Sequence, residues 1–330
     1  MTTFSLTVAL ALAVSAARPS AVVFGDHLLV ADGDGTVRAW KHATLEFDAA
    51  QTKKLNGDGL LAVVKSDGTL WGFDGVRAFT WDPNGARWDL VKGKPPPSPC
   101  RAFAIADGKP VGVCGAGVHR FTDGKSWDAP EFKGQISGRG FSDTPEIASR
   151  GSVVAIGTGY GEWGGHLFLL DVTSGTWNLY TDTLGNCAGI VPTEKGWFVA
   201  WSMSHMMAHT RARLHGADGK PLLEGPMLRD RYLRALTWGA EANAVIGLEQ
   251  NDLVKLSDTL GLEKVQSKVG QVRYGDERNA VGVSPGIGAF LAIGGGRYVI
   301  VPTSGPPLVV GGAKSVSLVA PAAVKPDAGR

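Results

Sequence analysis

The chain has 330 residues, of which 44% are apolar and 19% are charged, and it contains 46 glycines. This composition supplies a core and many turns, so it excludes disorder over most of the chain. The 33 basic and 31 acidic residues leave a formal charge of +2. Such a balance gives no reason to expect a nucleic-acid or acidic membrane partner.

The first residues resemble an export signal. Phe4 to Ala16 form an apolar stretch of secretory length that is too short to span a bilayer, although no basic residue precedes it. We therefore expect a signal peptide over residues 1–17 and a periplasmic or secreted protein. The alternative is a cytoplasmic protein in which this segment is a buried first strand or helix. No later segment has 18 uninterrupted apolar residues, so no membrane span is expected.

After residue 20 the chain is predicted to be all-β. Helical periodicity is nearly absent, and short alternating or β-branched runs are separated by glycine-containing turns. Asp-Gly pairs recur throughout, and these residues tolerate the positive φ of tight hairpin turns. Their number indicates many antiparallel hairpins.

A longer repeat organises these strands. Similar apolar runs begin at His27, Thr69, Lys109, Ser152, Gly196, Asn243 and Gly288, with successive offsets of 40 to 47 residues. This spacing fits a propeller blade of four antiparallel strands. We predict a single seven-bladed β-propeller over residues 18–312, with six or eight blades as alternatives. Residues 313–330 are predicted to be a C-terminal tail or a closing strand.

Three repeats share a hairpin motif in which an aromatic or apolar residue, Asp, a glycine turn and Trp follow one another. The motif runs from Trp81 to Trp88, from Leu170 to Trp177 and, one residue shorter, from Phe121 to Trp127. It resembles the outer hairpin of kelch-type repeats in kelch-like bacterial β-propellers. The adjacent glycine pair of kelch inner strands is not regular here, so the resemblance implies the fold and no activity. The tryptophans that we expect to pack between blades are Trp40, Trp81, Trp88, Trp127 and Trp177.

A ligand site is predicted in the fourth repeat. In propellers, the loops between second and third strands share a face with the connections between blades, and this face commonly binds ligands. The fourth such loop carries Tyr160, Glu162 and Trp163 among glycines. Two aromatic rings and a carboxylate could hold a sugar or a peptide by stacking and hydrogen bonding. A purely structural loop is the alternative.

The corresponding loop of the fifth repeat is rich in methionine and histidine. In an extended chain, Met203, His205, Met207 and His209 project to one side. Thioether and imidazole ligands favour copper, particularly Cu(I), so these residues form a candidate copper site. The alternative, which we favour, is that the methionines fill gaps in the core and the histidines cap a hydrated loop, leaving the protein without a cofactor.

The cysteines suggest one disulfide. Cys100 and Cys114 lie on two strands around an Asp107-Gly108 turn, which would bring the thiols together in an exported protein. Separate burial of these cysteines and Cys187 is the alternative. No Cys-x-x-Cys spacing occurs, so neither zinc nor dithiol redox chemistry is supported.

Two further segments carry weaker patterns. Gly294 to Gly296 precede another strand, so no helix N-terminus is available there to bind phosphate. The arginines of 211–213 and 229–234 are expected to be solvated edges.

These patterns favour a non-catalytic recognition or scaffold module that binds a protein, a peptide or a glycan on one face. The alternative is a propeller enzyme, such as a hydrolase, a lyase or a copper-dependent oxidase, with its site at the channel mouth. An enzyme needs polar residues that converge from several blades, and the sequence indicates only one suggestive cluster of loops.

Overall fold

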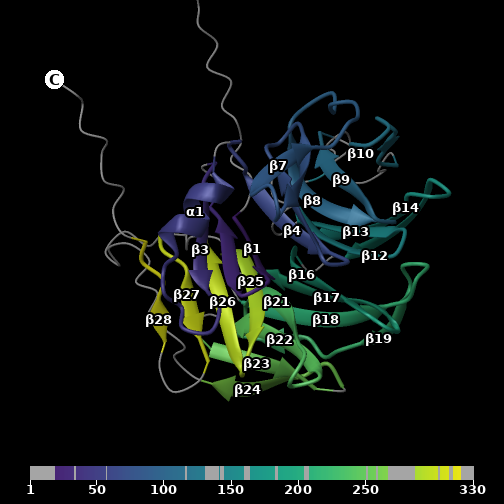
Figure 1. Cartoon of the computed structure of the whole chain (residues 1–330). Coiled ribbons are helices and arrows are strands. Elements are labelled where there is room, and N and C mark those ends of the chain that lie inside the picture. The colour runs from purple at the N-terminus through teal and green to yellow at the C-terminus, as the bar shows by residue number, and fades with distance from the viewer. Residues whose placement is uncertain are drawn as a thin grey trace, which may run out of the picture.

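The computed structural model is a ring of β-sheets arranged as the blades of a propeller (Figure 1). It describes residues 19–32, 35–56, 58–115, 117–130, 141, 145–159, 164–182, 185–203, 208–249, 252–257, 259–266, 287–303, 305–311 and 315–320. Within these residues there are seven antiparallel sheets and one short helix. The prediction of a seven-bladed all-β propeller is confirmed.

The first three blades follow one another along the chain. Blade 1 contains β1 (Ser20–Phe24), β2 (His27–Ala31), β3 (Val37–Lys41) and the helix α1 (Ala49–Leu55). Blade 2 contains β4 (Ala62–Ser66), β5 (Thr69–Phe73), β6 (Ala78–Asp82) and β7 (Arg87–Leu90). Blade 3 contains β8 (Cys100–Ala106), β9 (Lys109–Cys114), β10 (Gly117–Arg120) and β11 (Ser126–Asp128).

The remaining blades complete the ring. Blade 4 contains β12 (Glu146–Arg150), β13 (Val153–Gly159), β14 (Gly165–Asp171) and β15 (Thr176–Asp182). Blade 5 contains β16 (Asn186–Thr193), β17 (Gly196–Met203), β18 (His209–His215), β19 (Pro221–Glu224) and the short β20 (Leu228–Arg229). Blade 6 contains β21 (Leu233–Gly239), β22 (Ala244–Glu249), β23 (Asp252–Leu256) and β24 (Leu262–Gln266). Blade 7 contains β25 (Ile287–Gly294), β26 (Arg297–Pro302), β27 (Leu308–Val310) and β28 (Val316–Ser317).

Blade 1 departs from the expected four strands because α1 takes the outer position. Asp48 caps the helix by accepting a hydrogen bond from the Gln51 amide at 2.8 Å. Two side chains of this segment then accept hydrogen bonds from backbone amides at the outer edge of β3. Asn56 accepts from the Val37 amide at 2.8 Å, and the Thr52 hydroxyl accepts from the Ala39 amide at 3.0 Å. The helix thus provides partners that a fourth strand would otherwise supply.

Each joint between neighbouring blades contains an apolar cluster, so the described residues form seven clusters for seven joints. Trp40, Trp81, Trp88 and Trp127 are buried in these clusters, and Trp177 packs against one of them. The prediction that these tryptophans pack between blades is confirmed. Stacking the blades in a ring buries both faces of every sheet, which an isolated four-stranded sheet could not achieve.

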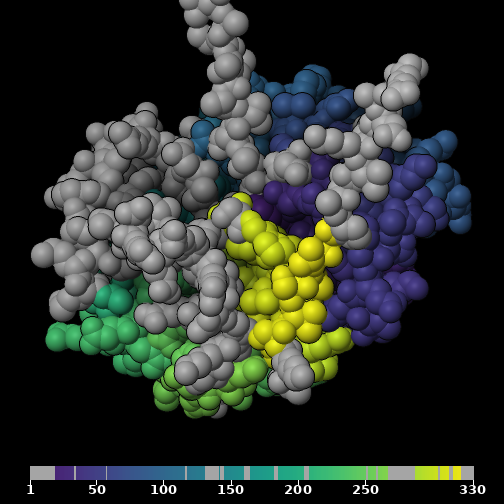
Figure 2. Space-filling view, turned by 90° about the vertical axis from the view of Figure 1, so that its left-hand side faces the viewer, coloured from purple at the N-terminus to yellow at the C-terminus, as the bar shows by residue number. Residues whose placement is uncertain are grey.

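The ring closes between blade 7 and blade 1. Figure 2 shows the last blade, in yellow, beside the first blade, in purple. Leu28 and Trp40 of blade 1 pack with Val299 and Val309 of blade 7, and the His42 ring bonds to the Ile293 carbonyl oxygen. β28 pairs with β27 in its own blade. Closure among the described residues therefore rests on side-chain packing and not on a strand shared by two blades.

A carboxylate connects blades 6 and 7 at the triple glycine. The amides of Gly295 and Gly296 donate to the two oxygens of Glu241, at 2.6 Å for Gly296. Gly294, Gly295 and Gly296 all have positive φ, which turns successive amides toward the anion. The glycine run therefore does bind an anion, but that anion is a glutamate of the neighbouring blade.

Candidate binding surface at the channel mouth

Strand pairing divides the turns between two faces of the ring. Turns that join first to second and third to fourth strands lie on one face, which we call the hairpin face. Loops that join second to third strands, and the connections between blades, lie on the opposite face, which we call the crossover face. The predicted ligand residues Tyr160, Glu162 and Trp163 belong to a crossover loop, but they lie outside the described residues.

The described flanks of the two predicted loops lie close together on this face. A Cβ atom at Gly165 would come within 2.6 Å of the Trp201 ring and 2.5 Å of the Gly185 carbonyl oxygen. A Cβ atom at Gly185 would in turn come within 2.9 Å of the Met203 Cβ. Only residues without side chains fit such close approaches. Gly159 and Met203, the described residues that precede the two predicted loops, therefore lie at the joint between blades 4 and 5.

Only part of the candidate copper site is described. Met203 and His209 pair directly across β17 and β18, so their side chains project to the same face of the sheet. His209 Nδ1 is buried without a hydrogen-bond partner. His205 and Met207 lie outside the described residues. Among the described residues, no group of three or more His, Cys, Asp or Glu side chains has a geometry that could hold a metal ion.

A polar network fixes the crossover face between blades 5 and 6. The Thr210 hydroxyl lies 2.9 Å from the Ser202 hydroxyl, donates to the Arg231 carbonyl oxygen at 3.0 Å and accepts from the Leu233 amide at 3.1 Å. The Arg231 guanidinium forms a two-pronged pair with Glu249, which is buried. Bidentate pairing holds this connection in one geometry.

Most of the arginines in this region are paired, contrary to the expectation of solvated edges. Arg213 is buried, donates to Glu224 at 2.9 Å and lies over the Tyr180 ring. The hydrogen bond from Arg213 lowers the pKa of Glu224. Burial lowers the pKa of His215, which lies 4.5 Å from the Tyr180 ring. Sequence alone suggested solvation because the apolar neighbours come from blade 4, which is distant along the chain.

The seven inner strands enclose a channel of about 460 Å³. Small and apolar residues line most of it, and the described charged lining residues are Lys65, Arg101, Glu146 and Arg234. Three positive charges against one negative charge give this channel a positive field, which low-dielectric walls strengthen. Its volume is in the range of small-molecule sites.

β-bulges occur near the start of four inner strands, at the crossover end of the channel. The pairing register shifts at Arg101, Ala188, Arg234 and Gly288, so each of these residues is the extra residue of its strand. A bulge redirects a side chain from the alternating pattern of the sheet. Sequence reasoning did not identify Arg101 and treated Arg234 as a solvated edge, because a bulge leaves no periodic signal when a strand is read as regular alternation.

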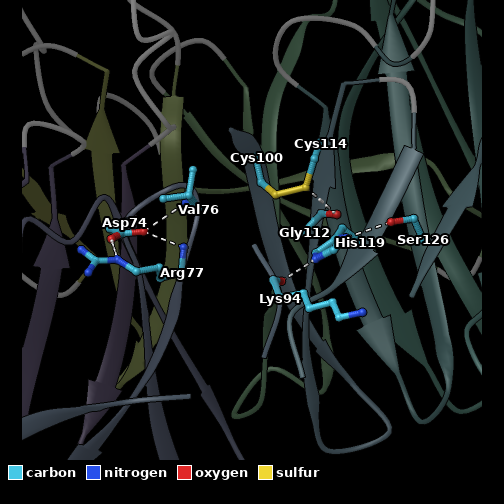
Figure 3. The surroundings of a disulfide bond; sticks show 9 residues. All are labelled: Asp74, Val76, Arg77, Lys94, Cys100, Gly112, Cys114, His119 and Ser126. Carbon is cyan, nitrogen blue, oxygen red and sulfur yellow. Dashed lines mark hydrogen bonds and ion pairs between the residues drawn. A yellow bond between two sulfur atoms is a disulfide. The ribbon is translucent and has the colours of Figure 1, made fainter. Parts of the chain in front are cut away.

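The disulfide lies beside one of these bulges. Cys100 and Cys114 are bonded across the first two strands of blade 3 (Figure 3). A Cβ atom at Gly112 would lie 2.7 Å from the Cys100 sulfur, so only glycine fits at position 112. The Cys100 amide also donates to the Gly75 carbonyl oxygen of blade 2 at 2.7 Å. These contacts fix the residue that precedes Arg101 at the channel mouth.

A buried histidine holds the outer part of blade 3. The His119 ring lies 2.9 Å from the Ser126 hydroxyl through Nδ1 and 2.9 Å from the Lys94 carbonyl oxygen through Nε2 (Figure 3). It therefore connects two strands of blade 3 to the segment that arrives from blade 2. Both ring nitrogens are engaged, which identifies His119 as a structural residue.

No protein-family model matches the chain, and no curated protein matches it in sequence. Solved structures share its fold. A chain of the mitotic checkpoint complex has a TM-score of 0.55 at 13% identity, covering 87% of this chain and 86% of that chain. Kluyveromyces lactis Hsv2 has a TM-score of 0.52 at 11% identity, covering 88% and 91%. The extracellular domain of BT4673 from B. thetaiotaomicron has a TM-score of 0.53 at 11% identity, covering 91% and 38%. At these identities the similarity shows the propeller fold alone.

Within the described part of the chain, the single helix has seven residues, and no helix is long and apolar enough to cross a membrane.

Proposed function

We propose that this propeller is a non-catalytic recognition or scaffold module that binds a protein, peptide or glycan at the channel mouth on the crossover face. The observation that carries the proposal is the pair of bulged arginines, Arg101 and Arg234, at the rim of a positively charged channel. Guanidinium groups bind carboxylates and sulfates by directed hydrogen bonds, so an acidic side chain or an acidic sugar is the group we expect at the mouth.

The neighbouring crossover loops would extend this surface. Tyr160, Glu162 and Trp163 follow Gly159, whose Cβ position is 2.5 Å from the Asn186 Cα of blade 5. Aromatic rings beside a basic channel could stack on a sugar ring or hold a peptide backbone. A partner that covers both the loop and the mouth would contact blades 3 to 6.

The Cys100–Cys114 disulfide supports the proposal that the protein is exported, because such bonds persist in oxidising compartments. The apolar segment Phe4 to Ala16 is consistent with a leader. Determination of the N-terminal residue of the protein from the periplasm or medium tests this point. A cytoplasmic protein with free Cys100 and Cys114 thiols would contradict it. The kelch-like classification is also a proposal, and it rests on the hairpin motif that three repeats share.

The test of the binding function compares variants on a glycan array and in cross-linking to co-expressed extracellular proteins. Arg101→Ala combined with Arg234→Ala should abolish capture, and so should Glu162→Ala combined with Trp163→Ala, while the melting temperature stays within a few degrees. The control combines Arg87→Ala with Lys220→Ala, both exposed on the hairpin face. Equal capture by the wild type and the mouth variant would overturn the proposal.

A copper-dependent activity is a second candidate, favoured by the in-register pair of Met203 and His209. Thioether and imidazole together select Cu(I). Purified protein would be titrated with Cu(I) against a colorimetric chelator. Loss of binding in a His205→Ala, His209→Ala double variant would support this function, and absence of binding to the folded wild type would exclude it.

A further inference from the structure

The joint between blades 5 and 6 opens into a groove on the hairpin face. Its volume is about 1200 Å³, and its apolar lining includes Phe198, Leu214, Val245 and Leu256. Phe198, Val245 and Leu256 belong to the apolar cluster of this joint, so the groove exposes the edge of an interblade core. It lies on the opposite face from the crossover loops.

Two large side chains at this groove remain accessible to solvent. Trp238 and Leu223, which both line the groove, are each 41% exposed. Trp238 pairs with Val245 across β21 and β22, which places its indole on the same side as the apolar cluster. Exposed aromatic residues beside an apolar hollow are typical of protein-binding surfaces.

Two other blades carry a tryptophan at the outer edge of the corresponding joint. In blades 2 and 4, the outer strand carries Trp88 and Trp177, paired with Trp81 and Leu170 of the third strand. Trp88 fills the joint with blade 1, and its indole nitrogen donates to the Leu55 carbonyl oxygen at 3.0 Å.

The same register position in blade 6 is Leu262, which pairs with Leu256 and faces blade 5. Leucine is smaller than tryptophan by roughly one aromatic ring, so it cannot fill the outer part of the joint. The joint therefore lacks the ring that closes the equivalent joints of blades 2 and 4.

The charges around the groove indicate the kind of partner that fits. The ionisable lining residues are Arg150, Lys195 and Lys255 against the single acidic Glu194. The Arg150 guanidinium bonds to the Thr193 carbonyl oxygen, which fixes it across the joint between blades 4 and 5. A two-fold contact between two copies of the chain would place this basic rim against itself, which is unfavourable.

We propose that this groove binds a short peptide segment of a partner protein, in which an aromatic anchor is flanked by carboxylates. The anchor would occupy the space that Trp88 and Trp177 fill in blades 2 and 4. The flanking carboxylates would meet Arg150 and Lys195. This site is separate from the channel mouth and does not depend on the function proposed there.

The probes are synthetic ten-residue peptides, each labelled with a fluorophore. The first has a central tryptophan flanked by leucine and glutamate, the second has lysine in place of every glutamate, and the third has alanine in place of the tryptophan. Fluorescence anisotropy should show that the first peptide binds at least tenfold more tightly than the other two. Equal affinities, or no binding by any peptide, would overturn the proposal.

Variants locate the site. Trp238→Ala and Lys195→Glu should each weaken binding of the first peptide by at least fivefold. The matched controls are Leu179→Ala, at an equally exposed position of blade 4, and Lys109→Glu, at the corresponding turn of blade 3. Both controls should bind like the wild type. Unchanged binding in Trp238→Ala, or equal losses in the controls, would overturn the assignment.

Leu262→Trp provides a test that retains the fold. It places a tryptophan beside Leu256, the lining residue with which Leu262 pairs, so it should reach into the outer part of the groove and reduce peptide binding at least tenfold while the melting temperature stays within a few degrees. The channel-mouth variants should bind the peptide normally, which separates this proposal from the function of the mouth. If sedimentation shows a dimer that Trp238→Ala dissociates, the occupant is a second copy and the peptide proposal is wrong.

Discussion

The joint between blades 1 and 2 and the joint between blades 5 and 6 both contain an apolar cluster, but their outer layers differ. The first is closed by Trp81, Trp88 and the helix α1, whose Leu55 is fully buried. The second has Leu262 at the position equivalent to Trp88, and a groove lined by Leu256 and Trp238 lies at its edge. The outer edge of the first joint therefore contributes buried contacts, whereas the outer edge of the second leaves Trp238 and Leu223 accessible to a partner.

Replacing a tryptophan at each joint should give the largest contrast. Trp88→Ala removes a buried indole, its hydrogen bond to Leu55 and its edge contact with Trp81, so it should cost about 3–5 kcal/mol. Trp238→Ala removes an exposed indole at the open joint and should cost less than about 0.5 kcal/mol. Urea denaturation of both variants checks this difference. Similar losses would mean that the groove is as tightly packed as the closed joint.

The disulfide should be the next largest contributor, because it lies in the closed joint between blades 2 and 3. Cys100 and Cys114 pack with Phe73 and Phe121 in that cluster. A crosslink that closes a loop of this length stabilises the fold by about 3 kcal/mol. Cys100→Ala combined with Cys114→Ala should lose this amount, whereas Cys187→Ala should lose about 1 kcal/mol. Urea denaturation with and without a reductant is the measurement. Wild-type protein that is insensitive to reductant would contradict the expectation.

Acid should destabilise the closed joint between blades 3 and 4. Burial lowers the pKa of His166 from 6.5 to about 4. Between these values the unfolded chain binds more protons than the folded protein, so stability falls as the pH falls through this window. The loss should approach about 3 kcal/mol at the acid end. Urea denaturation at several pH values should show a shallower dependence in His166→Gln. An unchanged slope would indicate that His166 is solvated.

The carboxylate between blades 6 and 7 should have the smallest effect. Glu241→Ala removes two hydrogen bonds to Gly295 and Gly296 at an exposed turn, so we expect a loss of about 1 kcal/mol. Glu241→Gln should retain part of this stability. Glu263→Ala, at an exposed position of β24, is the control and should be nearly neutral. A loss in Glu263→Ala as large as in Glu241→Ala would show that the effect is only a change of net charge.

The repeat could be predicted from the sequence because each blade repeats the alternation of its strands and the glycine turns between them. The Asp107-Gly108 turn fixes a register that brings Cys100 near Cys114, and the bulge at Arg101 then places the two cysteines directly opposite each other. The helix in blade 1 was missed because its signal is local: Asp48 is the cap, and no strand-like alternation follows.

The candidate sites were harder to predict. Bulges place Arg101 and Arg234 at the channel mouth, and a single register shift is invisible in apolar alternation. The groove is lined by residues of blades 4, 5 and 6 that are distant along the chain, and sequence patterns alone do not bring such residues together. Most of the site residues predicted from the sequence fall in crossover loops outside the described residues. They are Tyr160, Glu162, Trp163, His205 and Met207.

Closure by packing has a mechanical consequence. Among the described residues, separating blade 7 from blade 1 would disrupt apolar contacts and the His42 bond to Ile293, but no backbone ladder. Separating two strands within any blade would break a whole row of amide bonds. The joint between blades 7 and 1 should therefore open before the strands of either blade separate, and amide hydrogen exchange along β1 and β25 would report this order.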